Sequence, residues 1–220
     1  WYEAEYSAGL QAAVEANLLA VQDYDIIPEQ ERLLGRPLDP GIEILIVRYA
    51  KPYGIRIIGQ RFVAYYEWEA ATQLRIASHE IFHPPYDPND QQLADLLSDL
   101  KQDRWMSNIV ENHDPRYGYN SFEGVIDEGS TQALDQIVSE RLGFAKDPGE
   151  RWRDSDGGMH LFAAAAYQAM KEGSFDKNGG IFSEWLKSAL SSGQLSPAEV
   201  RRRASLVVGQ EAVDAWGVYE

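Results

Sequence analysis

Ala70-Ala-Thr-Gln-Leu-Arg-Ile-Ala-Ser-His79-Glu80-Ile-Phe-His83 is the stretch from which the rest of the chain can be interpreted. Its apolar residues recur at helical spacing, which predicts one helix, and Pro84-Pro85 must end that helix directly after His83. His79 and His83 lie four residues apart, so both imidazoles share one helical face and can bind a single metal ion. Glu80 then lies beside the metal, where a carboxylate can act on a metal-bound water. The simpler alternative is a polar helix face on which two histidines are neighbours by chance.

A third metal ligand is expected on a second helix, predicted from about Ser121 to Leu142 and ended by Gly143. The chain has 0 cysteines, so any metal takes histidine and carboxylate ligands. Glu128 is favoured because the small residues at 129–131 would let this helix approach the first one closely. Glu128 could instead serve only to stabilise the helix dipole. The other acidic residues considered as ligands are Glu123, Asp127 and Asp135.

Further polar residues are expected to orient the ligands or to stabilise the reaction. Three of them lie on the same helical face as Glu128 and could hydrogen-bond the ligands: Thr131, Gln132 and Asp135. His160 and Tyr167, on one face of an alanine-rich helix predicted over Met159–Lys171, are the leading candidates for a donor to the oxyanion. Tyr119 and Tyr117 are the next candidates. His160 could instead only begin its helix, and Tyr167 could only belong to the core.

His79-Glu80-x-x-His83, followed by a helix with Glu128-Gly-Ser-Thr131, resembles the gluzincin group of zinc metallopeptidases over roughly residues 60–140. The resemblance implies a zincin-like fold, a Zn²⁺ ion bound by His79, His83 and Glu128, and Glu80 as the general base. It also implies hydrolysis of peptide bonds in a peptide or protein substrate. The chain departs from the thermolysin-like pattern in the 44 residues between His83 and Glu128, and in Gln132, where those enzymes have aspartate.

Two other functions remain open. A catalytically inactive binding or regulatory module could keep the same fold, but the intact Glu80 favours an enzyme, because a structural zinc does not need it. A hydrolase with paired carboxylates, such as a glycosidase that uses Glu80 and Glu128 as acid and base, would leave the histidine spacing unexplained. We therefore expect a hydrolase of the metalloprotease class.

The composition excludes other classes of partner. A formal net charge of -15 would repel the phosphate backbone of nucleic acid. No segment of the sequence approaches the roughly 18 consecutive apolar residues that a membrane-spanning helix needs.

The first residue is Trp1 rather than Met. Removal of a signal peptide would explain this, as would a shortened recombinant chain. We expect an exported or secreted bacterial protein.

The remaining pattern predicts a mainly helical α+β protein with a small sheet beside the metal-binding helix. Residues 42–49 and 55–68 are rich in Ile, Val, Tyr and Phe and predict two strands, paired as a hairpin around Pro52-Tyr-Gly54. The length favours a single domain, residues 1–220, with an N-terminal α/β lobe over about 1–110 and a C-terminal helical lobe over about 111–220. Further helices are predicted over 3–22, over 28–34 and from Asp90 through Leu100. Two more helices are predicted after residue 171, and the last of them begins with a capping box at Ser196–Glu199. Residues 144–158 are predicted to form a loop.

Overall fold

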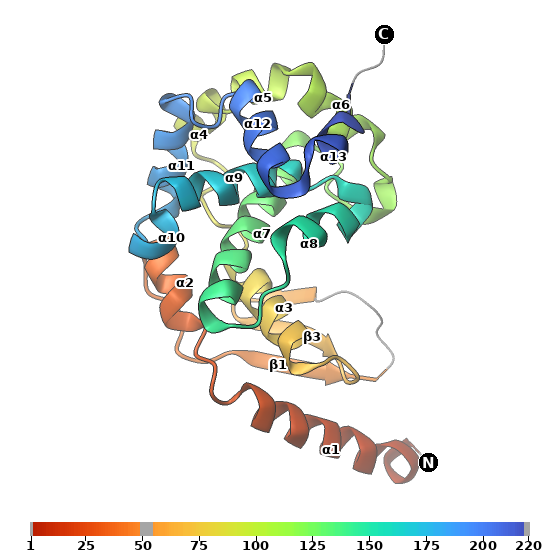
Figure 1. Ribbon diagram of the computed structural model, residues 1–220. Helices are drawn as coiled ribbons and strands as arrows, with labels where there is room; N and C mark the ends of the chain where they lie inside the picture. Colours follow the sequence, from red (N-terminus) through yellow and green to blue (C-terminus); the bar gives the residue numbers. More distant parts are fainter. Residues whose placement is uncertain (1, 49–54, 218–220) are drawn as a thin grey trace.

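The computed structural model describes residues 2–48 and 55–217, which form a mainly helical protein with one three-stranded mixed sheet. This arrangement confirms the predicted α+β class. Figure 1 shows α1 and the sheet at one end of the molecule and the C-terminal helices at the other, with α7 between them. The helices are α1 (Tyr2–Val21), α2 (Ile27–Leu34), α3 (Ala70–Phe82), α4 (Gln91–Leu96), α5 (Ser98–Gln102), α6 (Arg104–Asn112), α7 (Phe122–Leu142), α8 (Pro148–Asp154), α9 (Leu161–Glu172), α10 (Phe175–Asn178), α11 (Phe182–Ser191), α12 (Pro197–Val208) and α13 (Gln210–Asp214), with 3₁₀ turns η1 (Pro115–Tyr117) and η2 (Ser155–Gly158).

The sheet differs from the predicted hairpin. Strands β1 (Glu43–Val47), β2 (Ile55–Ile58) and β3 (Arg61–Tyr65) have the order β1-β3-β2, with β1 parallel and β2 antiparallel to β3. The second apolar run forms two strands because the chain turns at Gly59, whose φ of 56° is readily adopted only by glycine. The strand predicted at 42–49 does pair with the run at 55–68, but it pairs with the second half of that run and in the parallel direction, so the predicted hairpin is wrong. The predicted turn at 52–54 lies outside the described residues.

The two helices that carry the proposed ligands form as predicted. α3 ends at Phe82, and His83 already has an extended backbone, as expected for a residue that precedes proline. Helix α7 begins where the Ser121 side chain accepts a hydrogen bond from the Gly124 backbone N–H at 3.1 Å, and it ends at Gly143 in the left-handed conformation. α3 packs along α7, so residues far apart in the sequence meet.

The small residue after Glu128 serves a different contact from the one predicted. A Cβ atom at Gly129 would lie 3.0 Å from Phe162 Cδ1 and 3.2 Å from the backbone nitrogen of Ala163. Gly129 therefore allows the close approach of α7 to α9, whose residues from Leu161 to Ala166 are all buried. The expectation that the small residues at 129–131 bring α7 close to α3 is therefore wrong for Gly129, whereas Thr131 does face the end of α3, with its Oγ1 3.4 Å from His83 Nδ1.

Several short helices escape the sequence pattern. The predicted loop at 144–158 contains α8, which begins where the Asp147 carboxylate accepts a hydrogen bond from the Glu150 backbone N–H at 2.8 Å. The helix predicted from Asp90 is divided into α4 and α5, and α6 follows without having been predicted. In the described chain, four helices rather than two follow α9. The predicted capping box is not formed, because Ser196 makes no side-chain cap and Glu199 pairs with arginines of its own helix, Arg202 and Arg203.

One hydrophobic core joins the two ends of the molecule. A contiguous cluster of buried residues extends from Ile26 to Val213. Because α4 contacts α11 and α6 contacts α7, the packing continues across the expected lobe boundary near residue 110. Helix α1 is poorly covered, since Leu18 and Leu19 are 62% and 67% exposed. Within the described ranges, no helix combines the length and the apolar character needed to cross a membrane.

Candidate metal centre

His79, His83 and Glu128 form a cluster that could hold a metal ion. The Nε2 atoms of the two histidines are 3.1 Å apart, and Glu128 Oε2 lies 3.4 Å from His79 Nε2 and 3.3 Å from His83 Nε2. Glu128 is only 3% exposed, and its Oε2 receives no hydrogen bond from the described part of the chain. The structure thus brings together the three residues that the sequence selected as ligands.

The other ring nitrogen of each histidine faces a carboxylate. His79 Nδ1 lies 2.8 Å from Asp135 Oδ2, and His83 Nδ1 lies 2.9 Å from Asp127 Oδ2. Because a carboxylate favours a proton on the facing Nδ1, each neutral imidazole keeps its lone pair on Nε2. Two lone pairs and one carboxylate oxygen therefore converge, and a cation between them would satisfy all three.

Asp135 is itself fixed by an arginine. Arg151 Nη2 donates to Asp135 Oδ2 at 2.9 Å, its Nη1 contacts the other oxygen, and both residues are buried. Such a bidentate pair holds the carboxylate in one orientation, and the carboxylate in turn holds the His79 ring. The sequence predicts Asp135 in this role but gives no sign of Arg151, because residues 144–158 lack a helical pattern. Asp127 is expected from the sequence only as a metal ligand, since spacing does not show which histidine nitrogen a neighbouring carboxylate faces.

Gln132 links Glu128 to the buried core. Its Nε2 donates to Glu128 Oε1 at 2.8 Å, and its Oε1 accepts from Trp152 Nε1 at 2.8 Å, which fixes the orientation of the amide. His160 Nε2 lies 3.1 Å from Gln132 Nε2 and 2.8 Å from Asp156 Oδ2. Thr131 Oγ1 lies 3.4 Å from His83 Nδ1. The expectation that Thr131, Gln132 and Asp135 orient the ligands agrees with these contacts.

Two of the three tyrosines considered as oxyanion donors, Tyr167 and Tyr119, have different surroundings. Tyr167 donates to Glu140 Oε1 at 2.5 Å. Glu140 follows Glu128 by 12 residues on α7, which is roughly 18 Å along the helix. The structure therefore does not bring Tyr167 to the cluster. Tyr119 lines the same cleft as His79 and Glu80, and burial and the Glu128 carboxylate raise the pKa of its hydroxyl. The Tyr119 ring lies 6.1 Å from the His160 ring, centre to centre.

Glu80 is half-buried beside the ligands. The backbone N–H of Arg56, on the edge strand β2, donates to Glu80 Oε2 at 3.1 Å. Burial raises the pKa of the Glu80 carboxyl, although the nearby His79 and His83 oppose the shift. The edge strand therefore helps to orient Glu80, a contact that the sequence gave no means of finding.

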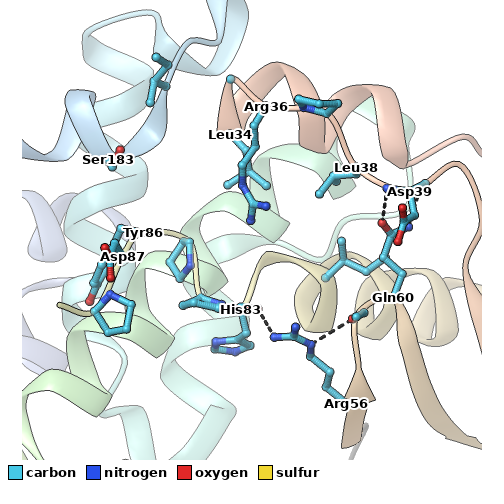
Figure 2. Close-up of a pocket in the computed structure, with 18 residues that line it drawn as sticks. Leu34, Arg36, Leu38, Asp39, Arg56, Gln60, His83, Tyr86, Asp87 and Ser183 are labelled. Carbon is cyan, nitrogen blue, oxygen red and sulfur yellow. Dashed lines mark hydrogen bonds between the residues drawn. The ribbon is translucent and has the colours of Figure 1, made fainter. Parts of the chain in front are cut away.

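The cluster borders two clefts. His79, Glu80, Tyr117 and Tyr119 line a cleft of about 410 Å³. His83 lines a larger cleft of about 940 Å³, in which the Arg56 guanidinium hydrogen-bonds the His83 backbone carbonyl (Figure 2). Because neighbouring ligands open onto different clefts, an extended molecule could reach the cluster from either side.

The His79 pKa predicts how the stability of the metal-free protein depends on pH. Burial alone would lower this pKa, but the Glu128 and Asp135 carboxylates raise it from 6.5 to about 10. The stabilisation by this proton is complete below the unfolded pKa of 6.5 and is lost as pH rises through about 10. We expect the melting temperature of chelator-treated protein to fall by about 3 °C or more between pH 7 and 10. Metal-loaded protein, measured beside it, should show a smaller fall; equal falls would contradict this view of His79.

Comparison with known proteins finds no relative: no family model, no curated protein and no solved structure matches this chain. Any function proposed for it therefore rests on the geometry of its own residues.

Proposed function

We propose that this protein is a zinc-dependent peptidase of the gluzincin type, with His79, His83 and Glu128 as zinc ligands and Glu80 as general base. The spacing of the ligand atoms carries the proposal. A tetrahedral zinc with bonds of about 2.0–2.1 Å separates its ligand atoms by roughly 3.3 Å. The corresponding separations here are 3.1, 3.3 and 3.4 Å.

The donor set supports zinc over magnesium and calcium. Two imidazole nitrogens and one carboxylate are a ligand set of catalytic zinc, which keeps a fourth position open. Magnesium and calcium instead prefer six or more oxygen ligands. The buried Glu128 oxygen, with no donor among the described residues, is satisfied by such an ion. These residues therefore fit the ion that the sequence resemblance implies.

The proposed chemistry assigns the proton transfers to Glu80. When bound, zinc would supply a water of lowered pKa and polarise the peptide carbonyl. Glu80 would accept a proton from the attacking water and pass it to the leaving amine, and a raised pKa suits a carboxylate that has both roles. The hydrogen bond from the Arg56 backbone holds Glu80 at the cleft during both transfers.

Tyr119 is the donor that the surroundings favour for the oxyanion. This residue lines the cleft with His79 and Glu80, and its hydroxyl is protonated at neutral pH, as its raised pKa ensures at higher pH as well, so that it can donate a hydrogen bond. Its backbone has a φ of 58°, an uncommon conformation for a residue other than glycine. The neighbouring loop is fixed by His113, whose Nε2 lies 2.9 Å from the Gly118 carbonyl oxygen. In this proposal His160 acts through Gln132 on Glu128.

The histidines beside Glu128 count against the glycosidase alternative. A glycosidase needs one carboxyl with a raised pKa as the acid, which Glu80 could supply, and one ionised carboxylate, but it has no use for two imidazoles that face that carboxylate. Burial tends to raise the pKa of Glu128, but the histidines beside it hold this pKa well below its usual range. An ionised Glu128 that faces two imidazoles suits a metal ligand. The inactive module remains the alternative to test.

The test of the proposed function is zinc-dependent cleavage. Zinc-loaded protein is incubated with a mixture of unstructured peptides, and the products are identified by mass spectrometry. We expect cleavage that a chelator abolishes and that added zinc restores. Cleavage that a chelator leaves unchanged would exclude the zinc mechanism. If protein with about one bound zinc cleaves nothing, the inactive binding module is the correct interpretation.

A further inference from the structure

The cleft beside Glu80 contains an arginine that has no ion-pair or hydrogen-bond partner in the described part of the chain. Arg75, Arg116 and Arg151 all line the cleft of about 410 Å³. Arg116 pairs with Asp114, and Arg151 pairs with Asp135. Arg75 forms no ion pair or hydrogen bond with any described residue. This cation stands out in a chain with 35 acidic and 20 basic residues.

The environment of Arg75 makes an anion a favourable neighbour. The residue is half-buried, and its pKa is lowered because burial disfavours the charge and because Arg151 lies nearby, although the Asp135 carboxylate opposes this shift without pairing with Arg75. Arginines in such surroundings are usually paired with a carboxylate, because an unpaired charge that has lost water is costly. A bound anion would remove this cost. A planar guanidinium matches a carboxylate with two parallel hydrogen bonds.

The position of Arg75 relates this anion to the proposed scissile bond. Arg75 precedes His79 by one helical turn, and both residues line the same cleft. One turn corresponds to roughly 6 Å along the helix axis, whereas one residue of an extended peptide spans about 3.3–3.6 Å. A group bound by Arg75 would therefore lie one or two residues from a carbonyl at the metal cluster.

We propose that Arg75 binds a carboxylate of the peptide substrate, one or two residues from the bond that is cut. The inference rests on the proposed peptidase function, which it refines by naming the substrate class. The carboxylate comes either from the C-terminus of the peptide or from an Asp or Glu side chain. Peptides that lack a carboxylate at this distance bind more weakly and are poorer substrates.

Binding to a form without turnover tests this proposal directly. Zinc-loaded Glu80→Gln protein is titrated by calorimetry with four acetylated pentapeptides of one sequence. The peptides combine a free or amidated C-terminus with Glu or Gln at the last residue but one. We expect Arg75→Met to weaken binding of the recognised peptides roughly 10- to 100-fold, which is the effect of losing charged hydrogen bonds. Arg75→Lys, which keeps the charge, should retain part of the affinity.

A matched control separates this contact from the general charge of the protein. Arg104 is exposed on α6 and is not among the residues that line the cleft, so Arg104→Met should change no affinity. Weaker binding on amidation assigns the carboxylate to the C-terminus, and weaker binding on the Glu-to-Gln change assigns it to the side chain. Equal affinity of the protein for all four peptides would overturn the proposal. The same holds if Arg75→Met weakens the binding of acidic and neutral peptides equally, or if the protein binds none of the four peptides.

The two proposals can fail independently. If wild-type protein cleaves no peptide but Arg75 still discriminates between acidic and neutral peptides, the peptidase proposal fails and the carboxylate site stands. If wild-type protein cleaves all four peptides at the same rate and binds them equally, the carboxylate site fails and the peptidase stands.

Discussion

Replacing Glu80 by glutamine is expected to leave zinc binding intact and to reduce kcat for peptide hydrolysis by about 10²–10⁴-fold, the usual contribution of a general base. Glutamine has nearly the same shape, and its side-chain oxygen can still accept the hydrogen bond from the Arg56 backbone N–H. It cannot take a proton from water. Because the substrate still binds, the loss should fall on kcat and leave KM nearly unchanged.

Steady-state kinetics and metal content together test the role of Glu80. Glu69→Gln is a matched control, since Glu69 is exposed at the N-terminus of the same helix and makes no side-chain cap. This control should retain wild-type turnover. A Glu80→Gln protein with kcat within a factor of two of wild type would exclude Glu80 as the base.

Removal of one ligand is expected to weaken zinc binding more than any other single change. Loss of a residue that only orients a ligand typically costs 10- to 100-fold in metal affinity. Glu128→Ala and His83→Ala each remove one of three protein ligands, so we expect losses larger than about 100-fold, with loss of hydrolysis. Competition against a zinc-binding dye gives the affinities, and circular dichroism shows whether each variant is folded.

Two variants of the same helix calibrate this result. Glu123 lies in the first turn of α7 and pairs with Lys101, so Glu123→Gln should bind zinc like the wild type. Asp135→Asn should fall between the control and the ligand variants, because Asp135 orients His79 from its Nδ1 side. Wild-type affinity in Glu128→Ala would place the third ligand elsewhere.

Local patterns in the sequence were sufficient to predict the helices that carry the cluster. A spacing of four residues on a helix places His79 and His83 side by side whatever the rest of the chain does. The capping serine at 121 and the glycine at 143 define the ends of α7, and Glu128 and its polar neighbours follow from helical geometry. Helical geometry alone does not predict that α7 meets α3. The expectation that Glu128 lies beside His79 and His83 came from the resemblance to a known ligand set.

Contacts between distant segments were not predictable in the same way. Pairing of β1 with β3 depends on the whole sheet, and a turn at Gly59 is one of several that the local sequence allows. Arg151 reaches Asp135 from a helix that has only seven residues and no clear periodicity. The choice between Tyr167 and Tyr119 depended on the loop before α7, whose shape is set by contacts such as that of His113 with Gly118.

The most direct test of the metal centre is the metal content of the wild-type protein, purified without chelator and measured by mass spectrometry under native conditions. The proposed three-ligand site predicts about one zinc ion per chain, removable by a chelator and restored by added zinc. Protein that stays folded but binds no zinc, even when zinc is supplied in excess, would contradict the metal centre and the peptidase mechanism built on it.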